Sequence, residues 1–212
     1  FIPGQADGHS ESDSTRLWQE YTWRSGKQVL ALRSTFSTVE TNRNASSGLP
    51  AGLPPADDSY DTWTGQFVYV HKVMENGAQI SLRGTLQDSD TGLLPTDDFA
   101  LGGVSTIRGY RENQFTFDEG HLLNLEFEYP LLKAGRDGLS LSLRPFIDYG
   151  RGRNVDADPD TISSAGLAMD AAWQGIEANL VYAERLSHPD FVDEQNDDWQ
   201  DRGVHFRLAY RF

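Results

Sequence analysis

Hydrophobic and polar residues alternate along much of this chain with a period of two. In the last segment, 203–212, large apolar side chains occupy every second position: Val204, Phe206, Leu208, Tyr210 and Phe212. This spacing places them on one face of a β-strand and the intervening residues on the other. In 120–130 it puts Glu126 and Glu128 opposite Leu125 and Phe127. Carboxylates facing inward would be costly in a soluble sandwich core, but a water-filled lumen accepts them.

The same alternation recurs often enough to indicate a single large sheet. We count nine candidate strands, at 14–24, 27–40, 60–72, 78–88, 120–130, 139–150, 161–171, 174–186 and 203–212. Their connections alternate between short ones (25–26, 73–77, 131–138, 172–173) and long ones (41–59, 89–119, 151–160, 187–201). Short turns at one rim and long loops at the other are typical of outer-membrane proteins. We therefore predict an all-β fold, an antiparallel transmembrane β-barrel.

Hydropathy and charge agree with this fold and exclude some functions. Mean hydropathy is −0.54, and no stretch approaches the roughly 20 apolar residues of a membrane helix. Membrane strands of about 10 residues, in which apolar and polar residues alternate, do not raise the mean hydropathy and so are not excluded by it. The net charge of −14 and the lack of clustered Lys and Arg argue against a nucleic-acid partner. The first residue is Phe1, which we interpret as the start of a mature or truncated piece.

Candidate chemistry for catalysis or metal binding is weak. Cysteine is absent, and the five histidines show no metal-binding spacing. Asp156, Asp158 and Asp160 imitate a calcium loop, but Thr161 replaces the turn glycine and Leu167 the bidentate Glu. The sequence also lacks G-x-S-x-G and phosphate-loop motifs. We expect no enzyme activity, no metal and no cofactor.

Two short motifs carry more information than the rest of the chain. The first lies inside the longest connection, 89–119, and reads Phe-Ala-Leu-Gly-Gly-Val-Ser-Thr-Ile-Arg-Gly-Tyr-Arg-Glu over 99–112. The second is Phe-Ile-Asp-Tyr-Gly over 146–150. Together they resemble the (V/I)RG(F/Y) lumen-loop motif and the F-x-D strand motif of the BamA-like superfamily. The Leu101-Gly102-Gly103 lead-in is most similar to the TpsB branch, which includes FhaC, ShlB and HecB.

This resemblance implies a site that joins the two motifs. In the superfamily the loop folds back into the pore and its Arg pairs with the Asp of the strand, here Arg108 with Asp148. The alternation in 139–150 by itself places Phe146 and Asp148 on the polar face of that strand. The implied site residues are Gly102, Gly103, Ile107, Arg108, Gly109 and Tyr110 in the loop, and Phe146, Asp148 and Gly150 in the strand. Glycines would allow positive φ at the loop tip.

The resemblance also sets the extent of the chain. TpsB barrels have sixteen strands, with the motif loop between the eleventh and twelfth, so this chain would supply the C-terminal nine or so, strands eight to sixteen. We expect residues 1–212 to be one portion of a barrel domain that lacks the periplasmic POTRA domains. Tyr210 and Phe212 resemble the C-terminal signal by which the insertion machinery recognises barrels.

The implied function is export of a large exoprotein, of the haemolysin or adhesin type, by two-partner secretion across the Gram-negative outer membrane. The expected partners are the exoprotein client, outer-membrane lipid and lipopolysaccharide, and the barrel-assembly machinery. The alternatives are a BamA- or TamA-like insertase, a structural or porin-like surface barrel, and the pore half of a fused outer-membrane lipase. The sequence identifies neither the client nor the organism.

Overall fold

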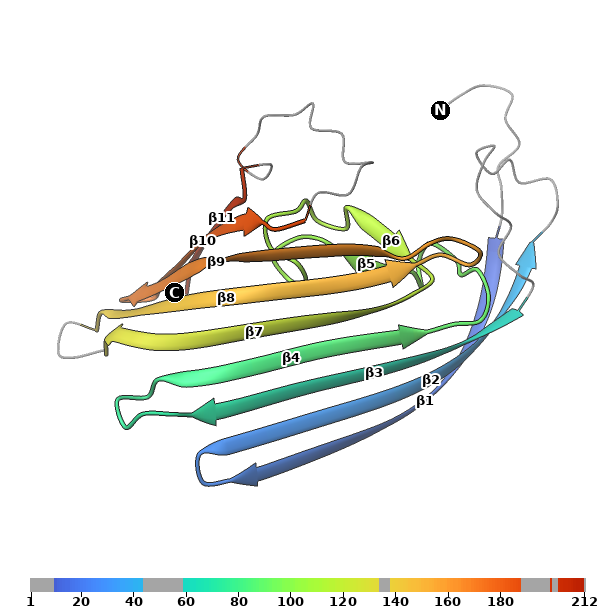
Figure 1. Ribbon diagram of the computed structural model, residues 1–212. Helices are drawn as coiled ribbons and strands as arrows, with labels where there is room; N and C mark the ends of the chain where they lie inside the picture. The colour runs from blue at the N-terminus through green and yellow to red at the C-terminus, as the bar shows by residue number, and fades with distance from the viewer. Residues whose placement is uncertain (1–9, 44–58, 134–137, 188–198, 200–201, 212) are drawn as a thin grey trace.

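The computed structural model describes residues 10–43, 59–133, 138–187, 199 and 202–211 (Figure 1). The regular elements of this part are all strands: β1 (Ser10–Ser25), β2 (Gln28–Arg43), β3 (Ser59–Lys72), β4 (Gln79–Asp88), β5 (Phe99–Leu101), β6 (Phe115–Phe117), β7 (Glu119–Leu132), β8 (Ser140–Arg153), β9 (Asp160–Trp173), β10 (Ile176–Arg185) and β11 (Val204–Tyr210). No helix in the described ranges is long and apolar enough to cross a membrane.

Nine of these strands form one antiparallel sheet in the order β1-β2-β3-β4-β7-β8-β9-β10-β11. The nine predicted strands are all confirmed, each within a few residues of its expected ends. Figure 1 shows a curved sheet with the short turns after β1, β3 and β9 at one end and the described connections after β4 and β8 at the other. Each strand pairs with the next in this order, and β1 and β11 form its two edges among the described residues.

The two faces of the sheet divide the side chains as the alternation predicts. Residues on the outer face are apolar and exposed, for example Leu125, Ile147 and Leu180. Their inward neighbours Glu126 and Asp148 are buried and charged. This inverts the usual arrangement of a soluble protein, in which apolar side chains are buried and charged ones exposed. An apolar outer surface with a polar inner face is the pattern of a sheet surrounded by lipid.

The long connection between β4 and β7 contains structure that the sequence did not predict. Its strands β5 and β6 pair with each other to form a small second sheet, with Phe99 opposite Phe117 and Leu101 opposite Phe115. These side chains are buried in one cluster with Ile107, Tyr110, Leu122 and Ile162. The connection is therefore folded onto the inner face of the main sheet by its own hydrophobic core.

One expected boundary was wrong. The long connection predicted at 151–160 is shorter, because β8 continues to Arg153 and β9 begins at Asp160. Gly152 lies in this extension, and its inner face lies against the side chain of Phe117 in the folded connection. Glycine usually weakens a strand, but it is favoured where another segment approaches the backbone closely.

Candidate functional site: the arginine of the lumen loop

The loop tip, residues 102–114, turns back on itself through three glycines. Gly102, Gly103 and Gly109 have φ values of +106°, +99° and +94°, as the motif predicts. These values lie where glycine is tolerated and other residues are strained. A Cβ atom on Gly103 would also lie 2.2 Å from the Glu112 carboxylate. That carboxylate accepts a hydrogen bond of 2.8 Å from the backbone N–H of Val104 and so closes the turn.

Glycines in the sheet provide the surface on which this loop rests. A Cβ on Gly150 would lie 2.9 Å from Leu101 Cδ1 and 3.2 Å from Ile107 Cδ1, and both of these side chains are fully buried. Gly120 lies beneath Phe99 in the same way. The expected motif residues Ile107 and Gly150 are thus in contact with each other. The glycine on β8 leaves the space that the loop isoleucine fills.

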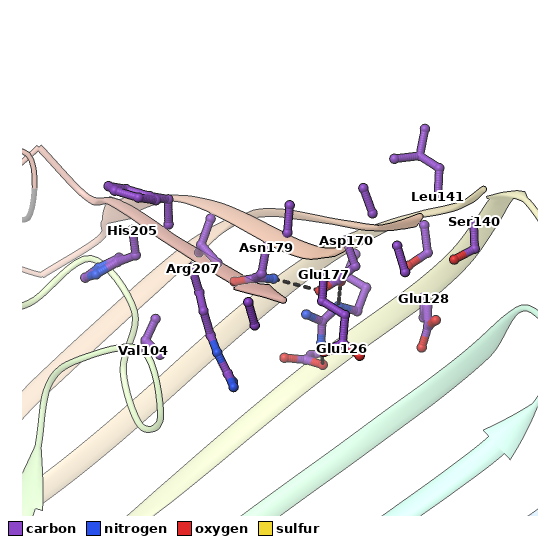
Figure 2. Close-up of a pocket in the computed structure, with 18 of the residues that line it drawn as sticks. Val104, Glu126, Glu128, Ser140, Leu141, Asp170, Glu177, Asn179, His205 and Arg207 are labelled. Atoms are coloured by element: carbon purple, nitrogen blue, oxygen red, sulfur yellow. Dashed lines mark hydrogen bonds and ion pairs between the residues drawn. The ribbon is translucent and has the colours of Figure 1, made fainter. Parts of the chain in front are cut away.

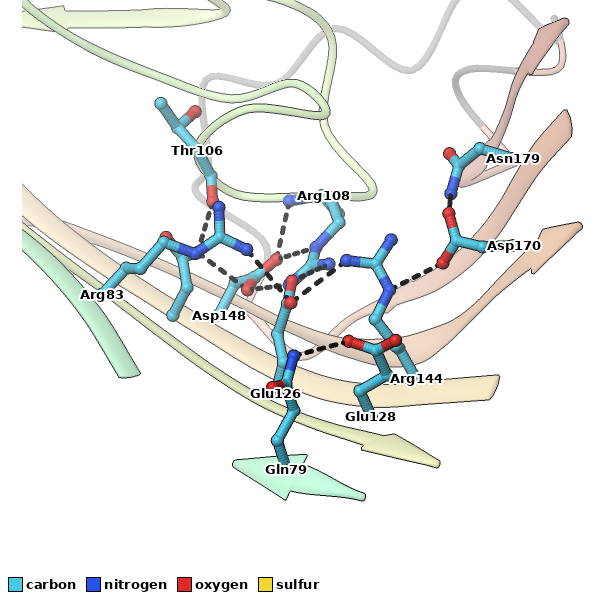
Figure 3. Close-up of polar contacts among 11 residues, drawn as sticks. Gln79, Arg83, Thr106, Arg108, Glu126, Glu128, Arg144, Asp148, Asp170 and Asn179 are labelled. Atoms are coloured by element: carbon cyan, nitrogen blue, oxygen red, sulfur yellow. Dashed lines mark hydrogen bonds and ion pairs between the residues drawn. The ribbon is translucent and has the colours of Figure 1, made fainter. Parts of the chain in front are cut away.

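Arg108 binds Asp148 through two parallel hydrogen bonds. Its Nη2 donates to Oδ1 at 2.7 Å and its Nε donates to Oδ2 at 2.8 Å, and its backbone N–H adds a third bond of 3.1 Å to Oδ2 (Figure 3). Asp148 is fully buried and Arg108 nearly so. This planar two-point geometry is specific to a guanidinium, because a lysine ammonium binds as a point charge. The expected pair of side chains is therefore in direct contact.

A second carboxylate completes the environment of the guanidinium. Nη1 of Arg108 donates to Oε1 of Glu126 at 2.6 Å, and the ring centroid of Phe146 lies 3.4 Å from Cζ. Burial by itself lowers the pKa of Arg108, but the hydrogen bond and charge of Asp148, followed by those of Glu126, outweigh it. The pKa therefore lies above its ordinary value, and the arginine stays charged.

Glu126 is shared among three arginines. Its other oxygen, Oε2, accepts hydrogen bonds from Arg83 at 3.0 Å and from Arg144 at 3.3 Å. Arg144 in turn donates to Asp170 at 2.8 Å, so the ion pairs extend from β4 across to β9 (Figure 3). The two oxygens of this one carboxylate thus bind Arg83, Arg108 and Arg144 together. The loop arginine is one member of a charged network on the inner face of the sheet.

Asn124 holds the loop backbone to the same network. Its side-chain N–H₂ group donates to Oδ1 of Asp148 at 2.8 Å and to the backbone oxygen of Thr106 at 2.6 Å. Because both hydrogens are used, the amide connects the strand carboxylate with the turn that precedes Arg108. The position of Arg108 is therefore fixed by backbone contacts as well as by charge.

A cavity of about 1100 Å³ lies beside this network (Figure 2). Its lining is mixed in charge: Arg83, Arg108, Arg144 and Arg207 face Glu126, Glu128, Asp170 and Glu177. The loop contributes Val104, and β11 contributes His205 and Arg207, which Figure 2 shows on the opposite side from Glu128. Apolar side chains such as Leu132, Leu141 and Val181 share the lining with these charged groups. The charged side chains favour water in this space and can form hydrogen bonds with an extended peptide backbone.

The sequence predicted some residues of this site but not all of them. Alternation places Asn124 and Glu126, and likewise Arg83 and Arg144, correctly on the inner face, but none of these four residues was assigned to the site. The available signal was parity, since Asn124 and Glu126 share a face on the strand that follows the motif loop. Tyr210 lies on the exposed outer face, and Phe212 lies outside the described residues. The roles assigned to the motif residues stay predictions.

Comparison with known families gives one match that covers most of the chain. The model of the family "Haemolysin secretion/activation protein ShlB/FhaC/HecB" matches residues 9–172. This range includes both motifs and all strands from β1 to β8.

Individual relatives are more distant or match over shorter stretches. The heme/hemopexin transporter protein HuxB of Haemophilus influenzae strain 86-028NP is 29% identical over 102 residues, which are 48% of this chain and 17% of HuxB. Its counterpart in strain ATCC 51907 is 37% identical over 67 residues, 32% of this chain and 12% of that protein. The chain thus spans less than a fifth of the length of these relatives.

Solved structures share the fold over almost the whole chain. CdiB from Escherichia coli superposes with a TM-score of 0.66 at 15% identity, covering 95% of this chain and 45% of CdiB. CdiB from Acinetobacter baumannii gives a TM-score of 0.58 at 15% identity, with 96% and 42% covered. At this identity the likeness shows the arrangement of strands and nothing about the substrate.

Proposed function

Since this chain belongs to the ShlB/FhaC/HecB family of haemolysin secretion/activation proteins, we propose that it forms part of a pore that exports a protein partner by two-partner secretion. The observation that carries the proposal is the buried contact between Arg108 and Asp148. It fixes the β4–β7 loop to the inner face, next to a cavity that charged side chains help to line. A pore that must be closed at rest needs such an internal obstruction.

The proposed cycle is passive. At rest the loop tip occupies the inner face, held by ion pairs that are all internal to the protein. During export an unfolded client displaces the tip or passes beside it, and the mixed charges of the cavity offer hydrogen-bonding groups to its backbone. We propose that no catalytic step is involved and that folding of the client outside the cell gives the process its direction.

Family and fold both point to the outer membrane of Gram-negative bacteria. We propose that the exposed apolar face contacts outer-membrane lipid and lipopolysaccharide, and that the barrel-assembly machinery inserts the protein. Exposed Phe206, Leu208 and Tyr210 on β11 support this, because a strand with alternating large apolar residues is suited to a lipid boundary. The client is a secreted protein of unidentified sequence.

The experiment that tests the proposal is deletion of the gene for the complete protein, followed by quantitative proteomics of culture supernatant and outer membrane. Loss of one large secreted protein, with other outer-membrane proteins unchanged, is the expected result. Complementation with the parental gene should restore that protein, and complementation with Arg108→Ala should restore the barrel without restoring secretion.

Two other outcomes would contradict the proposal. A general loss of barrel proteins from the outer membrane would indicate an insertase, because that class acts on many clients. An unchanged supernatant and an unchanged outer membrane would indicate a surface barrel with no protein client. Measuring supernatant and outer membrane from the same culture distinguishes a secretion pore, an insertase and a surface barrel.

A further inference from the structure

A second set of contacts fastens the loop tip to β10, away from Asp148. Arg185, the last residue of β10, donates from Nε to the backbone oxygen of Gly109 at 2.6 Å. Its Cζ atom also lies 5.1 Å from the ring centroid of Tyr110. The residue after Arg108 is thus held by an arginine from the sheet, whereas Arg108 is held by carboxylates from the sheet.

Tyr110 extends these contacts to the connection that follows β10. The Tyr110 side chain is fully buried, and its hydroxyl donates to the backbone oxygen of Ser187 at 2.6 Å. The Ser187 hydroxyl in turn accepts a hydrogen bond of 2.7 Å from the backbone N–H of Ser163 on β9. The loop tip therefore contacts β9, β10 and the beginning of the β10–β11 connection through one side chain.

Close packing at Gly109 shows that this second contact is part of the fold. A Cβ atom on Gly109 would lie 3.2 Å from the Cβ of Ala183, which is buried on β10. Ala183 also donates its backbone N–H to Gly203 just before β11, at 2.9 Å. The backbone of the tip thus lies directly on the last hairpin of the sheet.

We propose that Arg185 is a positioning residue that, with Tyr110 and Ser187, forms a second anchor for the loop tip, so that the tip leaves the inner face only when both anchors open. The first anchor, Arg108 with Asp148 and Glu126, holds the tip to β7 and β8. The second holds it to the last hairpin and the connection beyond it. The idea that both anchors must open during export rests on the proposed function. The position of the loop against the sheet is independent of that function.

The two anchors differ in what breaks them. The first depends on charge pairs buried at the centre of the sheet. The second depends on backbone oxygens and an aromatic ring, near the end of β10 where the long connections lie. Displacement of Ser187 would therefore loosen the tip without any change at Asp148. A client that moves Ser187 would thereby act on the loop.

Ser164 offers a reporter for the position of the tip. In the strand register it lies between Asp148 on β8 and Arg185 on β10, and it is fully buried. Among the described residues its hydroxyl has no hydrogen-bond partner, so Ser164→Cys changes little. The 212 residues contain no cysteine that would compete for a thiol reagent. Labelling at this position should require the tip to lift.

The test is the rate at which a charged, water-soluble thiol reagent labels Ser164→Cys in the complete protein in outer-membrane vesicles. Adding Arg185→Ala should raise the rate about tenfold, the size expected for loss of one hydrogen bond to a charged donor. Arg185→Lys, which keeps a cation and a donor, should bring the rate part of the way back. Heat modifiability of each variant checks that the barrel has folded.

Two controls complete the design. Arg33→Ala removes an arginine that contacts Glu20 and Trp18 on the first hairpin, and it should leave the labelling rate unchanged. Arg108→Ala should raise the rate through the first anchor. An unchanged rate in Arg185→Ala, in folded protein, would overturn the second anchor whether or not Arg108→Ala responds.

The second anchor and two-partner secretion are tested by different measurements, so either proposal can be contradicted without the other. The expected labelling pattern in a protein whose deletion changes no secreted protein would contradict two-partner secretion and leave the second anchor standing. Normal secretion, with a labelling rate that Arg185→Ala does not change, would contradict the second anchor and leave two-partner secretion standing.

Discussion

Arg108 and Asp148 are 40 residues apart in the chain, and they meet through paired hydrogen bonds of 2.7 and 2.8 Å in the interior of the protein. Neither residue could be buried alone, because an unpaired charge in this environment is strongly destabilising. Each therefore fixes the position of the other. A loop of irregular structure thereby gains a single defined place against the sheet.

Replacing Arg108 with Ala should abolish or sharply reduce export while leaving barrel assembly largely intact. Removing one partner of a buried pair costs about 3–5 kcal/mol, and here that cost falls on the loop, since the nine-strand ladder does not depend on it. Arg108→Lys should also be impaired, because an ammonium cannot make both bonds to Asp148. Secretion is measured against the amount of barrel in the membrane. Parental export from Arg108→Ala would contradict the role given to the loop.

Replacing Gly150 with Ala should loosen the loop without removing any polar contact. The added Cβ would be 2.9 Å from Leu101 and 3.2 Å from Ile107, two side chains that are fully buried and have no free space. Overpacking of this kind costs about 1–3 kcal/mol. The measurement is susceptibility of the 89–118 connection to limited proteolysis. Gly92→Ala is the matched control, since its Cβ would meet nothing within 4 Å.

The base of the loop should be weaker at neutral pH than in acid because of Asp98. Burial, followed by the charges of Asp118 and Asp97, raises the pKa of Asp98 to about 6 from an ordinary value of 3.8. A carboxyl whose pKa is raised by folding contributes stability below pH 3.8, and this contribution is lost as pH rises through 6. Asp98→Asn should therefore raise the apparent Tm more at pH 7.5 than at pH 4.5.

A matched variant in the same connection checks this assignment. Asp90 is exposed, and Asp90→Asn removes the same formal charge from the same connection. It should change the apparent Tm equally at the two pH values. An Asp98→Asn protein whose Tm shift does not vary with pH would show that another group controls the loop base.

Placing a charge on the outer face should impair membrane insertion far more than placing it on the inner face. Ile147 is 54% exposed on the apolar side of β8, and Arg on a lipid-facing strand costs about 2–4 kcal/mol at the bilayer midplane. Ile147→Arg should reduce the heat-modifiable protein in the outer membrane. Ser81→Arg, on the opposite face of β4, should be tolerated. Equal yields of the two variants would contradict the lipid-facing assignment.

The alternation of the sequence determined most of the sheet. Strand positions and the face of each side chain follow from a period of two, because strand geometry imposes that period on every residue. The period of two places Glu126 and Asp148 on the inner face, where the structure shows both in contact with Arg108. The pairing of Arg108 with Asp148 came from resemblance to a family, since alternation gives a face and not a partner.

The tertiary structure decided what the loop touches. Nothing local in the sequence distinguishes Arg83, Arg144 and Arg185 from other inward arginines, because their partners lie in segments that are distant in the chain. The β5–β6 pair likewise escaped prediction, since three-residue strands are too short to show a period. These features depend on which side chains the curvature of the sheet brings within hydrogen-bonding distance. Only the folded chain specifies that distance.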